Sequence, residues 1–179
     1  MTEVQTIEQP EAQKRTLGGI DIRAAIIAGL IAAVVFLILE MALLPLIGVS
    51  ATAPLNMMAA MVMGTEVLPP AALTIGIFLT AFIIHLALSI IYAFILAAFI
   101  NRRPSRQALT IGLIFGLVLF LVNFYIFTAF FPWFAEARNW VNVVAHLAFG
   151  ATAAMVYIRA EAGSKGWASG GQRLKERTV

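Results

Sequence analysis

Four long apolar stretches constrain this chain more than any other feature. They cover residues 22–47, 72–100, 108–131 and 140–158. An α-helix rises about 1.5 Å per residue, so about 20 residues cross a hydrocarbon core of about 30 Å. The stretches do not alternate polar and apolar residues, as the strands of a membrane barrel do. The sequence therefore predicts an all-α, polytopic membrane protein built as a four-helix transmembrane bundle.

The composition supports a lipid environment. Of 179 residues, 61% are hydrophobic and only 12% are charged, whereas soluble domains are about half apolar and about a quarter charged. A soluble fold of this size could not hide so much apolar surface, because much of a small protein's surface faces solvent. The chain has no cysteine, which excludes disulfides, thiolate metal sites and cysteine nucleophiles. We expect the lipid bilayer to be its main partner, and no nucleic acid.

The basic residues predict the orientation in the membrane. Of the 12 Lys and Arg residues, only Arg138 lies on one side of the predicted bundle. The others share the opposite side: Lys14, Arg15, Arg23, Arg102, Arg103, Arg106, Arg159, Lys165, Arg173, Lys175 and Arg177. The positive-inside rule then places both termini in the cytoplasm. We expect flexible cytoplasmic tails at residues 1–20 and 161–179, the second of them basic, around a bundle at 21–160.

A short helix is predicted at residues 54–63, between the first two stretches. Pro54 stands at its start and Gly64 follows its end, which are typical helix boundaries. It is too short to span, so we expect it at the outer interface or as a re-entrant segment. It carries four methionines: Met57, Met58, Met61 and Met63. Thioethers could bind Cu(I), but Met is also an adaptable packing residue, which is the favoured interpretation, and no metal site is predicted.

The chain also contains an internal similarity. RAAIIAGLIAAVVFLILE, which ends at Glu40, aligns without a gap with RQALTIGLIFGLVLFLVN, which ends at Asn123. The second and fourth stretches share HLALS, from His85, and HLAFG, from His146. These matches predict a duplicated helical hairpin, with the copies related by an axis along the membrane normal. The short helix is then an insertion in the outer loop of the first copy.

Polar residues inside the apolar stretches form a candidate polar core. Its members are Glu40, His85, Asn123, Asn142 and His146, and a path continues inward through Ser89 and Tyr92. Helical rise places Glu40, Asn123 and His146 in the outer third of the bilayer. It places His85 one or two turns deeper, unless its stretch projects above the membrane. A carboxylate facing lipid is strongly disfavoured, so Glu40 should pair with a histidine or be protonated.

Several interpretations of this cluster stay open. The residues could be interhelical hydrogen-bonding groups that only hold the helices together. The series Glu40, His146, His85, Ser89 and Tyr92 could also form a partial proton or cation path. Paired histidines could ligate a b-type haem, as in four-helix cytochromes. A glutamate with histidines could bind a divalent metal.

Two segments carry a family resemblance. HLALSIIYAF and FPWFAEARNWVNVVAHLAFG resemble the YagU-type group of small bacterial inner-membrane proteins, over roughly residues 72–159. The resemblance implies a helical fold in a bacterial inner membrane. It implies no mechanism, because that group has no established activity to carry over.

The sequence contains no nucleophile–base pair, P-loop, dinucleotide fingerprint or metal-hydrolase motif, so we predict a non-enzymatic protein. The leading hypothesis is a small tetraspan inner-membrane protein that acts as an accessory or assembly component, with a buried cluster that handles protons or ions. The alternatives are a haem electron carrier that uses His85 and His146, and a small-solute or cation transporter that works as an oligomer. A homodimer or a larger membrane complex is the expected assembly.

Overall fold

The fold is an all-α bundle, as predicted. The computed structural model describes residues 16–17 and 19–176, with side chains described up to residue 163. Its helices are α1 (Ile22–Leu43), α2 (Ala53–Met63), α3 (Ile75–Ile100), α4 (Ser105–Leu121) and α5 (Trp140–Glu176). Four segments are long and apolar enough to cross a membrane: Ile22–Ile47, Ile75–Ile100, Ser105–Ala129 and Trp140–Gly163. The chain is therefore a multi-pass membrane protein by helix length and composition.

Short polar residues set where the long helices begin. The side-chain oxygens of Asp21, Thr74 and Asn139 accept backbone N–H bonds from the first turns of α1, α3 and α5, at 3.0, 3.3 and 3.1 Å. Such caps satisfy donors that have no partner within the helix. Asn139 therefore precedes α5 and starts it. The predicted short helix is present as α2, with Pro54 in its first turn and Gly64 at φ +96° after its end.

The described parts of the two predicted flexible tails contain some regular structure. Two short antiparallel strands, β1 (Thr16–Leu17) and β2 (Ile20–Asp21), lead into α1. At the other end α5 continues to Glu176, although a flexible tail was predicted from residue 161. Extending a helix that already exists avoids the cost of nucleating one, so a polar segment can continue it. Residues 1–15, 18 and 177–179 lie outside the described structure.

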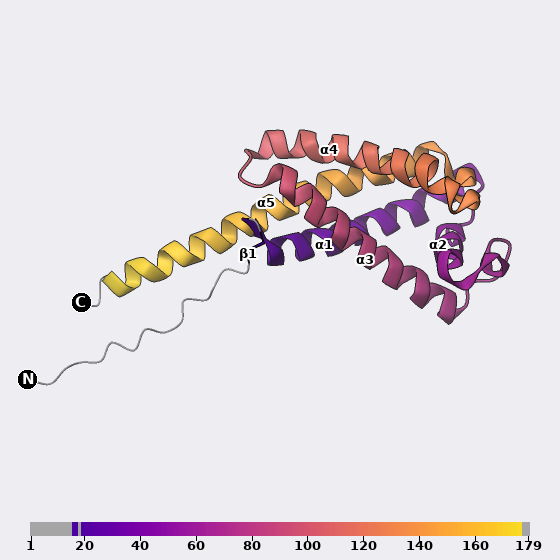
Figure 1. Cartoon of the computed structure of the whole chain (residues 1–179), viewed down its shortest axis with the longest axis horizontal. Coiled ribbons are helices and arrows are strands. Elements are labelled where there is room, and N and C mark those ends of the chain that lie inside the picture. The colour runs from indigo at the N-terminus through magenta and orange to yellow at the C-terminus, as the bar shows by residue number, and fades with distance from the viewer. Residues whose placement is uncertain (1–15, 18, 177–179) are drawn as a thin grey trace, which may run out of the picture.

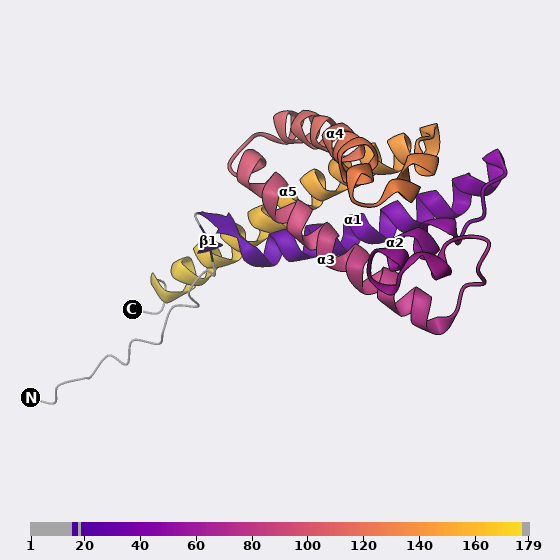
Figure 2. The ribbon, with the colours of Figure 1, turned by 45° about the vertical axis from the view of Figure 1, so that its right-hand side comes forward.

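Helix α5 lies at the centre of the bundle and packs along both α1 and α4, while α3 packs against α1 (Figure 1). A tight turn joins α3 to α4, and the two helices then diverge, as Figure 2 also shows. Asn101 in that turn donates to the Gly19 carbonyl at 3.1 Å. We call this the inner end, after the predicted topology, and the end that holds α2 the outer end. At the outer end, Trp133 Nε1 donates to the Met57 carbonyl at 3.0 Å.

The two predicted hairpin copies cross at equivalent positions. Gly29 of α1 lies against the backbone of Ser89 in α3, where an added Cβ would come within 2.9 Å of the Ser89 carbonyl oxygen. In the second copy, Gly112 of α4 lies against the backbone of Gly150 in α5. The sequence alignment pairs Gly29 with Gly112 and Ser89 with Gly150. Both crossings thus use a glycine to let two backbones approach closely.

A second pair of contacts, one helical turn further out, repeats this equivalence. His85 Nε2 lies 3.1 Å from the Ala33 carbonyl oxygen in the first copy. Gly116 lies against the His146 carbonyl in the second copy. The alignment pairs Ala33 with Gly116 and His85 with His146. These contacts support the predicted duplication.

Candidate functional site

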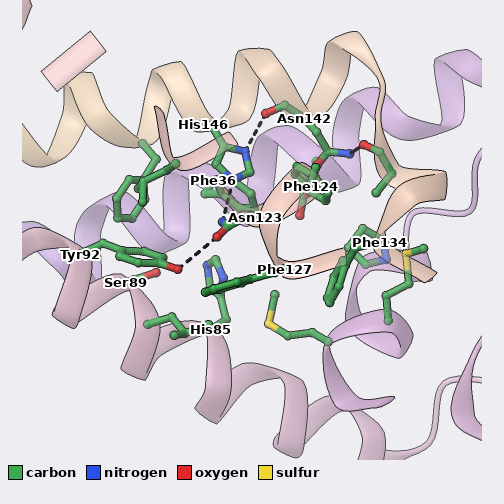
Figure 3. A pocket seen from close by; sticks show the side chains of 18 of the residues that line it. Phe36, His85, Ser89, Tyr92, Asn123, Phe124, Phe127, Phe134, Asn142 and His146 are labelled. Carbon is green, nitrogen blue, oxygen red and sulfur yellow. Dashed lines mark hydrogen bonds between the residues drawn. The ribbon is translucent and has the colours of Figure 1, made fainter. Parts of the chain in front are cut away.

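A pocket lies toward the outer end of the bundle, among α1, α2, α3, α5 and the segment that follows α4 (Figure 3). It contains about 830 Å³ of empty space, a figure that includes the open side of the pocket. All the residues of the predicted polar core and of the inward path line it: Glu40, His85, Ser89, Tyr92, Asn123, Asn142 and His146. The remaining wall is mostly aromatic and thioether side chains. The structure thus brings the whole predicted cluster into one cavity.

Both histidine rings lie against one phenylalanine ring. The ring centroid of Phe36 is 5.3 Å from that of His85 and 4.9 Å from that of His146. Both rings therefore lie beside the same residue of α1. Helix α3 crosses α1 at an angle (Figure 2), so a residue count along α3 alone does not give the depth of His85.

A hydrogen-bond chain crosses the pocket wall from α3 to α5 (Figure 3). Tyr92 Oη donates to Asn123 Oδ1 at 3.1 Å, and Asn123 Nδ2 lies 3.2 Å from His146 Nε2. His146 Nδ1 lies 2.7 Å from the Asn142 carbonyl oxygen. Because a carbonyl only accepts, the His146 proton sits on Nδ1, and Nε2 accepts from the asparagine amide. Every hydrogen-bonding atom in this chain has a donor matched to an acceptor.

Asn123 reaches this chain from an irregular segment. The helix α4 ends at Leu121, and Val122–Ile126 form a π-helical turn. Arg138 supports the turn, since its Nε donates to the Phe124 carbonyl at 2.7 Å and its guanidinium lies 4.4 Å from the Tyr125 ring centroid. The predicted uninterrupted span missed this turn. The one signal for it was Arg138, the single basic residue on the outer side.

Glu40 is the exception in the cluster. Its side chain is only 3% exposed, and Oε2 has no hydrogen-bond partner among the described residues. No hydrogen bond or ion pair joins it to a histidine in the described part of the chain, so of the two expected states, pairing with a histidine or protonation, the first is not formed. The reason is that the ring N–H groups of His85 and His146 go to backbone carbonyls instead.

A second acceptor in the same pocket is also without a partner. Asn142 is 1% exposed, and its Nδ2 donates to the Ala137 carbonyl at 2.8 Å, but Oδ1 has no partner among the described residues. Native proteins leave few buried polar atoms unpaired, and each such atom calls for an explanation. Two of them in one pocket point to a group outside the protein chain that supplies donors.

The geometry does not suit the haem alternative. Bis-histidine ligation needs two free ring nitrogens that face each other across the porphyrin. Here both rings lie against Phe36, His85 Nε2 is bonded to the Ala33 carbonyl, and both His146 nitrogens are engaged.

A metal site has little support either. The described residues contain no group of three or more His, Cys, Asp or Glu that could hold a metal ion. Of the four methionines in and around α2, Met57, Met58 and Met61 line the pocket, whereas Met63 is exposed.

Four apolar helices and a mostly apolar pocket that holds a few polar groups define a membrane-bundle protein. Residues 20–166 match the Family of unknown function (DUF6789), and the chain belongs to this family. No curated protein and no solved structure gives a match. The family covers the whole predicted bundle, and the resemblance to the YagU-type group stays a prediction.

Proposed function

We propose that this is a non-enzymatic protein of a bacterial plasma membrane that binds a small amphipathic molecule in its outer pocket. The observation that carries the proposal is the combination of an apolar wall with two buried acceptors that lack partners, Glu40 Oε2 and Asn142 Oδ1. An accessory role in a larger membrane complex is compatible with such binding and stays a prediction.

The wall suits the apolar body of a ligand. Five phenylalanines line the pocket: Phe36, Phe124, Phe127, Phe134 and Phe149. Three methionines of α2 add flexible thioethers, which adapt to ligands of different shape. Ligand sites generally combine a mostly apolar lining with a few fixed polar groups that orient the ligand.

Hydrogen bonding between helices does not account for the whole cluster. Side chains that only hold helices together bond to one another, as Tyr92, Asn123 and His146 do. Glu40 Oε2 makes no such bond among the described residues. Burying a polar atom without a partner costs free energy. An apolar residue there would pack with less cost, so the carboxyl group is better explained by a ligand.

Two features support the non-enzymatic part of the proposal. Ser89 is the serine that lines the pocket. No described hydrogen bond joins its hydroxyl to a histidine that could act as a base. The ring N–H groups of both histidines donate to backbone carbonyls. Such bonds are typical of histidines that stabilise a fold.

The orientation is tested with single cysteines, because the chain has none of its own. Ser50 at the outer end and Ser105 at the inner end are both exposed. In cells with a permeabilised outer envelope, a membrane-impermeant maleimide should label Ser50→Cys but not Ser105→Cys until the cells are lysed. Labelling of Ser105→Cys alone before lysis would reverse the orientation.

Binding is tested in nanodiscs of phosphatidylcholine with 4-phenylbutan-1-ol as the probe, by titration calorimetry against empty nanodiscs. Wild-type protein should show saturable binding. Met58 lines the pocket, so Met58→Trp should fill it and weaken the affinity for the probe by about tenfold or more. Met63→Trp, an exposed position in the same helix, is the matched control and should bind like wild type.

The proposal fails if wild type shows no saturable binding, or if both tryptophan variants bind equally well. Circular dichroism and gel filtration establish that each variant is folded. Ser89→Leu fills the pocket from α3 and serves as the second blocking variant if Met58→Trp does not fold.

A further inference from the structure

We infer that the pocket selects a lipophilic ammonium ion, whose cationic nitrogen binds at Glu40 and whose apolar body lies against the phenylalanine rings. This inference rests on the proposed function that the pocket binds an amphipathic molecule, and it names the chemical class of that molecule.

The first argument is charge. Glu40 is the one acidic residue among those that line the pocket, and no Lys or Arg lines it. Arg138 is the basic residue on the same side of the bundle, but its guanidinium is bonded to the Phe124 carbonyl and to Thr128 Oγ1. In the described part of the chain, a Glu40 carboxylate therefore has no counter-charge from the protein. A cationic ligand would supply it.

The second argument is hydrogen bonding. The histidine donors on the pocket wall are already used: His85 donates to the Ala33 carbonyl, and His146 donates to the Asn142 carbonyl. Of the buried atoms without a partner, Asn142 Oδ1 is an acceptor, and Glu40 Oε2 is one when its carboxyl group is ionised. A ligand that completes this pocket must therefore bring donors, and an ammonium group brings up to three.

The third argument is the aromatic wall. The face of an aromatic ring carries negative electrostatic potential and attracts cations, most strongly where water is excluded. Phe36 and Phe124 are 7% and 6% exposed, and both line the pocket with Glu40. A neutral donor such as an alcohol could satisfy the two acceptors, but it would gain much less from the rings.

An inorganic cation fits this wall less well. Ca²⁺ takes about six to eight oxygen ligands and Mg²⁺ demands octahedral oxygen coordination. The pocket offers few oxygens beyond Glu40 and Asn142, and the described residues hold no cluster of three potential metal-binding side chains. An organic cation needs no such shell, and its hydrocarbon part fills the aromatic side of the pocket.

The test compares two probes that share one apolar body, 4-phenylbutylammonium and 4-phenylbutan-1-ol, in phosphatidylcholine nanodiscs without net lipid charge. Wild type should bind the ammonium about tenfold or more tightly than the alcohol. In Glu40→Gln the preference for the ammonium over the alcohol should be lost, so that the two probes bind with equal affinity. Glu66→Gln removes an exposed carboxylate at the same end of the bundle and should keep the preference.

The outcomes separate this inference from the proposed function. If the alcohol binds and Met58→Trp blocks it, but the ammonium binds no more tightly, the inference is overturned and the proposed function stands. If Glu66→Gln removes the preference as fully as Glu40→Gln does, attraction by surface charge explains it, and the inference is again overturned. If neither probe binds saturably, the proposed function itself fails.

A measurement on wild type alone covers the case in which Glu40→Gln does not fold. The anion 4-phenylbutyrate has a similar apolar body and the opposite charge. It should bind less tightly than the alcohol, giving the order ammonium, alcohol, carboxylate. An equal affinity of the ammonium and the carboxylate would overturn the inference without any variant.

Discussion

The two hairpins share their helix crossings and differ in how they treat one aligned polar position. In the second hairpin, Asn123 bonds through both ends of its amide, to Tyr92 and to His146. In the first hairpin the aligned residue is Glu40, which leaves Oε2 without a partner among the described residues. The same place in the fold therefore holds an amide that links helices in one copy and a carboxyl oxygen without a partner among the described residues in the other.

The local backbone explains part of this difference. The π-helical turn Val122–Ile126 follows α4 and carries Asn123, whereas α1 remains α-helical through Glu40 and ends at Leu43. π-Helical turns are rare and are often found at functional sites. Here the turn carries Asn123, whose amide is paired at both ends. The regular helix α1 carries Glu40, whose Oε2 has no partner among the described residues.

The largest effect should come from the glycine crossings, where an added methyl group meets backbone. Gly116→Ala would place a Cβ against the His146 carbonyl, and Gly29→Ala would place one 2.8 Å from Ile90 Cα. We expect Gly116→Ala to cost about 3 kcal/mol of unfolding free energy and Gly29→Ala about 1–2 kcal/mol, because backbone cannot move aside as a side chain can. Denaturation in mixed micelles measures both.

Gly76→Ala is the control, since the nearest atom to its added Cβ is Thr74 Oγ1 at 3.9 Å. Its unfolding free energy should stay within about 0.5 kcal/mol of wild type. A cost for Gly29→Ala at least as large as for Gly116→Ala would show that the first crossing is as tight as the second.

The aligned polar pair gives the next largest effect, with opposite signs in the two copies. Asn123→Leu leaves Tyr92 Oη and His146 Nε2 without partners and should cost about 1–2 kcal/mol. Glu40→Leu removes an acceptor that has no partner and should leave stability unchanged or raise it. The same denaturation assay compares them. Equal losses in both variants would mean that Glu40 supports the fold as Asn123 does, and the contrast between the hairpins would be lost.

These contrasts also show how far the sequence could predict the structure. The four spans follow from apolar length, since the hydrocarbon core dictates it. The polar cluster follows from the repeat, because aligned residues in duplicated hairpins occupy similar places. Of the two states expected for Glu40, pairing with a histidine or protonation, the structure lacks the first, because backbone carbonyls of Ala33 and Asn142 take the histidine N–H groups. The pattern of side chains in the sequence does not show which histidine N–H groups will bond to backbone carbonyls instead of to a carboxyl group.

The π-helical turn and the tilt of α3 were out of reach for a related reason. Hydrophobic residues in a span buried on one side and facing lipid on the other show no strong periodicity, so a local change of helix type leaves no clear pattern. The tilt depends on which backbones approach closely, such as Gly29 against Ser89. It is a property of the packed pair of helices.

Arg138 offers a smaller test, directed at the turn that aims Asn123. Arg138→Gln removes the bond to the Phe124 carbonyl and the contact with the Tyr125 ring. It should cost about 1 kcal/mol and raise hydrogen exchange in residues 122–129, which follow α4, above that of α4 itself. Arg106→Gln, at an exposed position of the inner end, is the control. Unchanged exchange at 122–129 in Arg138→Gln would mean that the turn holds without the arginine.

The smallest effect should appear where the two hairpins meet at the outer end. Trp133 lies in the loop before α5, and its Nε1 donates to the Met57 carbonyl of α2, the insertion in the first copy. Trp133→Phe keeps an aromatic ring and removes only that bond. The cost should be about 0.5–1 kcal/mol. The rate of amide hydrogen exchange in α2, Ala53–Met63, should rise by about twofold to fivefold, because the helix opens locally more often. Trp140→Phe, at a position whose side chain is 52% exposed, should leave that exchange unchanged.

The same variant also tests how the pocket releases its probe, because α2 lines the pocket. Faster opening of α2 in Trp133→Phe should speed dissociation of 4-phenylbutan-1-ol. The affinity difference between ammonium and alcohol depends on Glu40 and should stay the same. A change in that difference would mean that the outer loop, and not the first hairpin, selects the ligand.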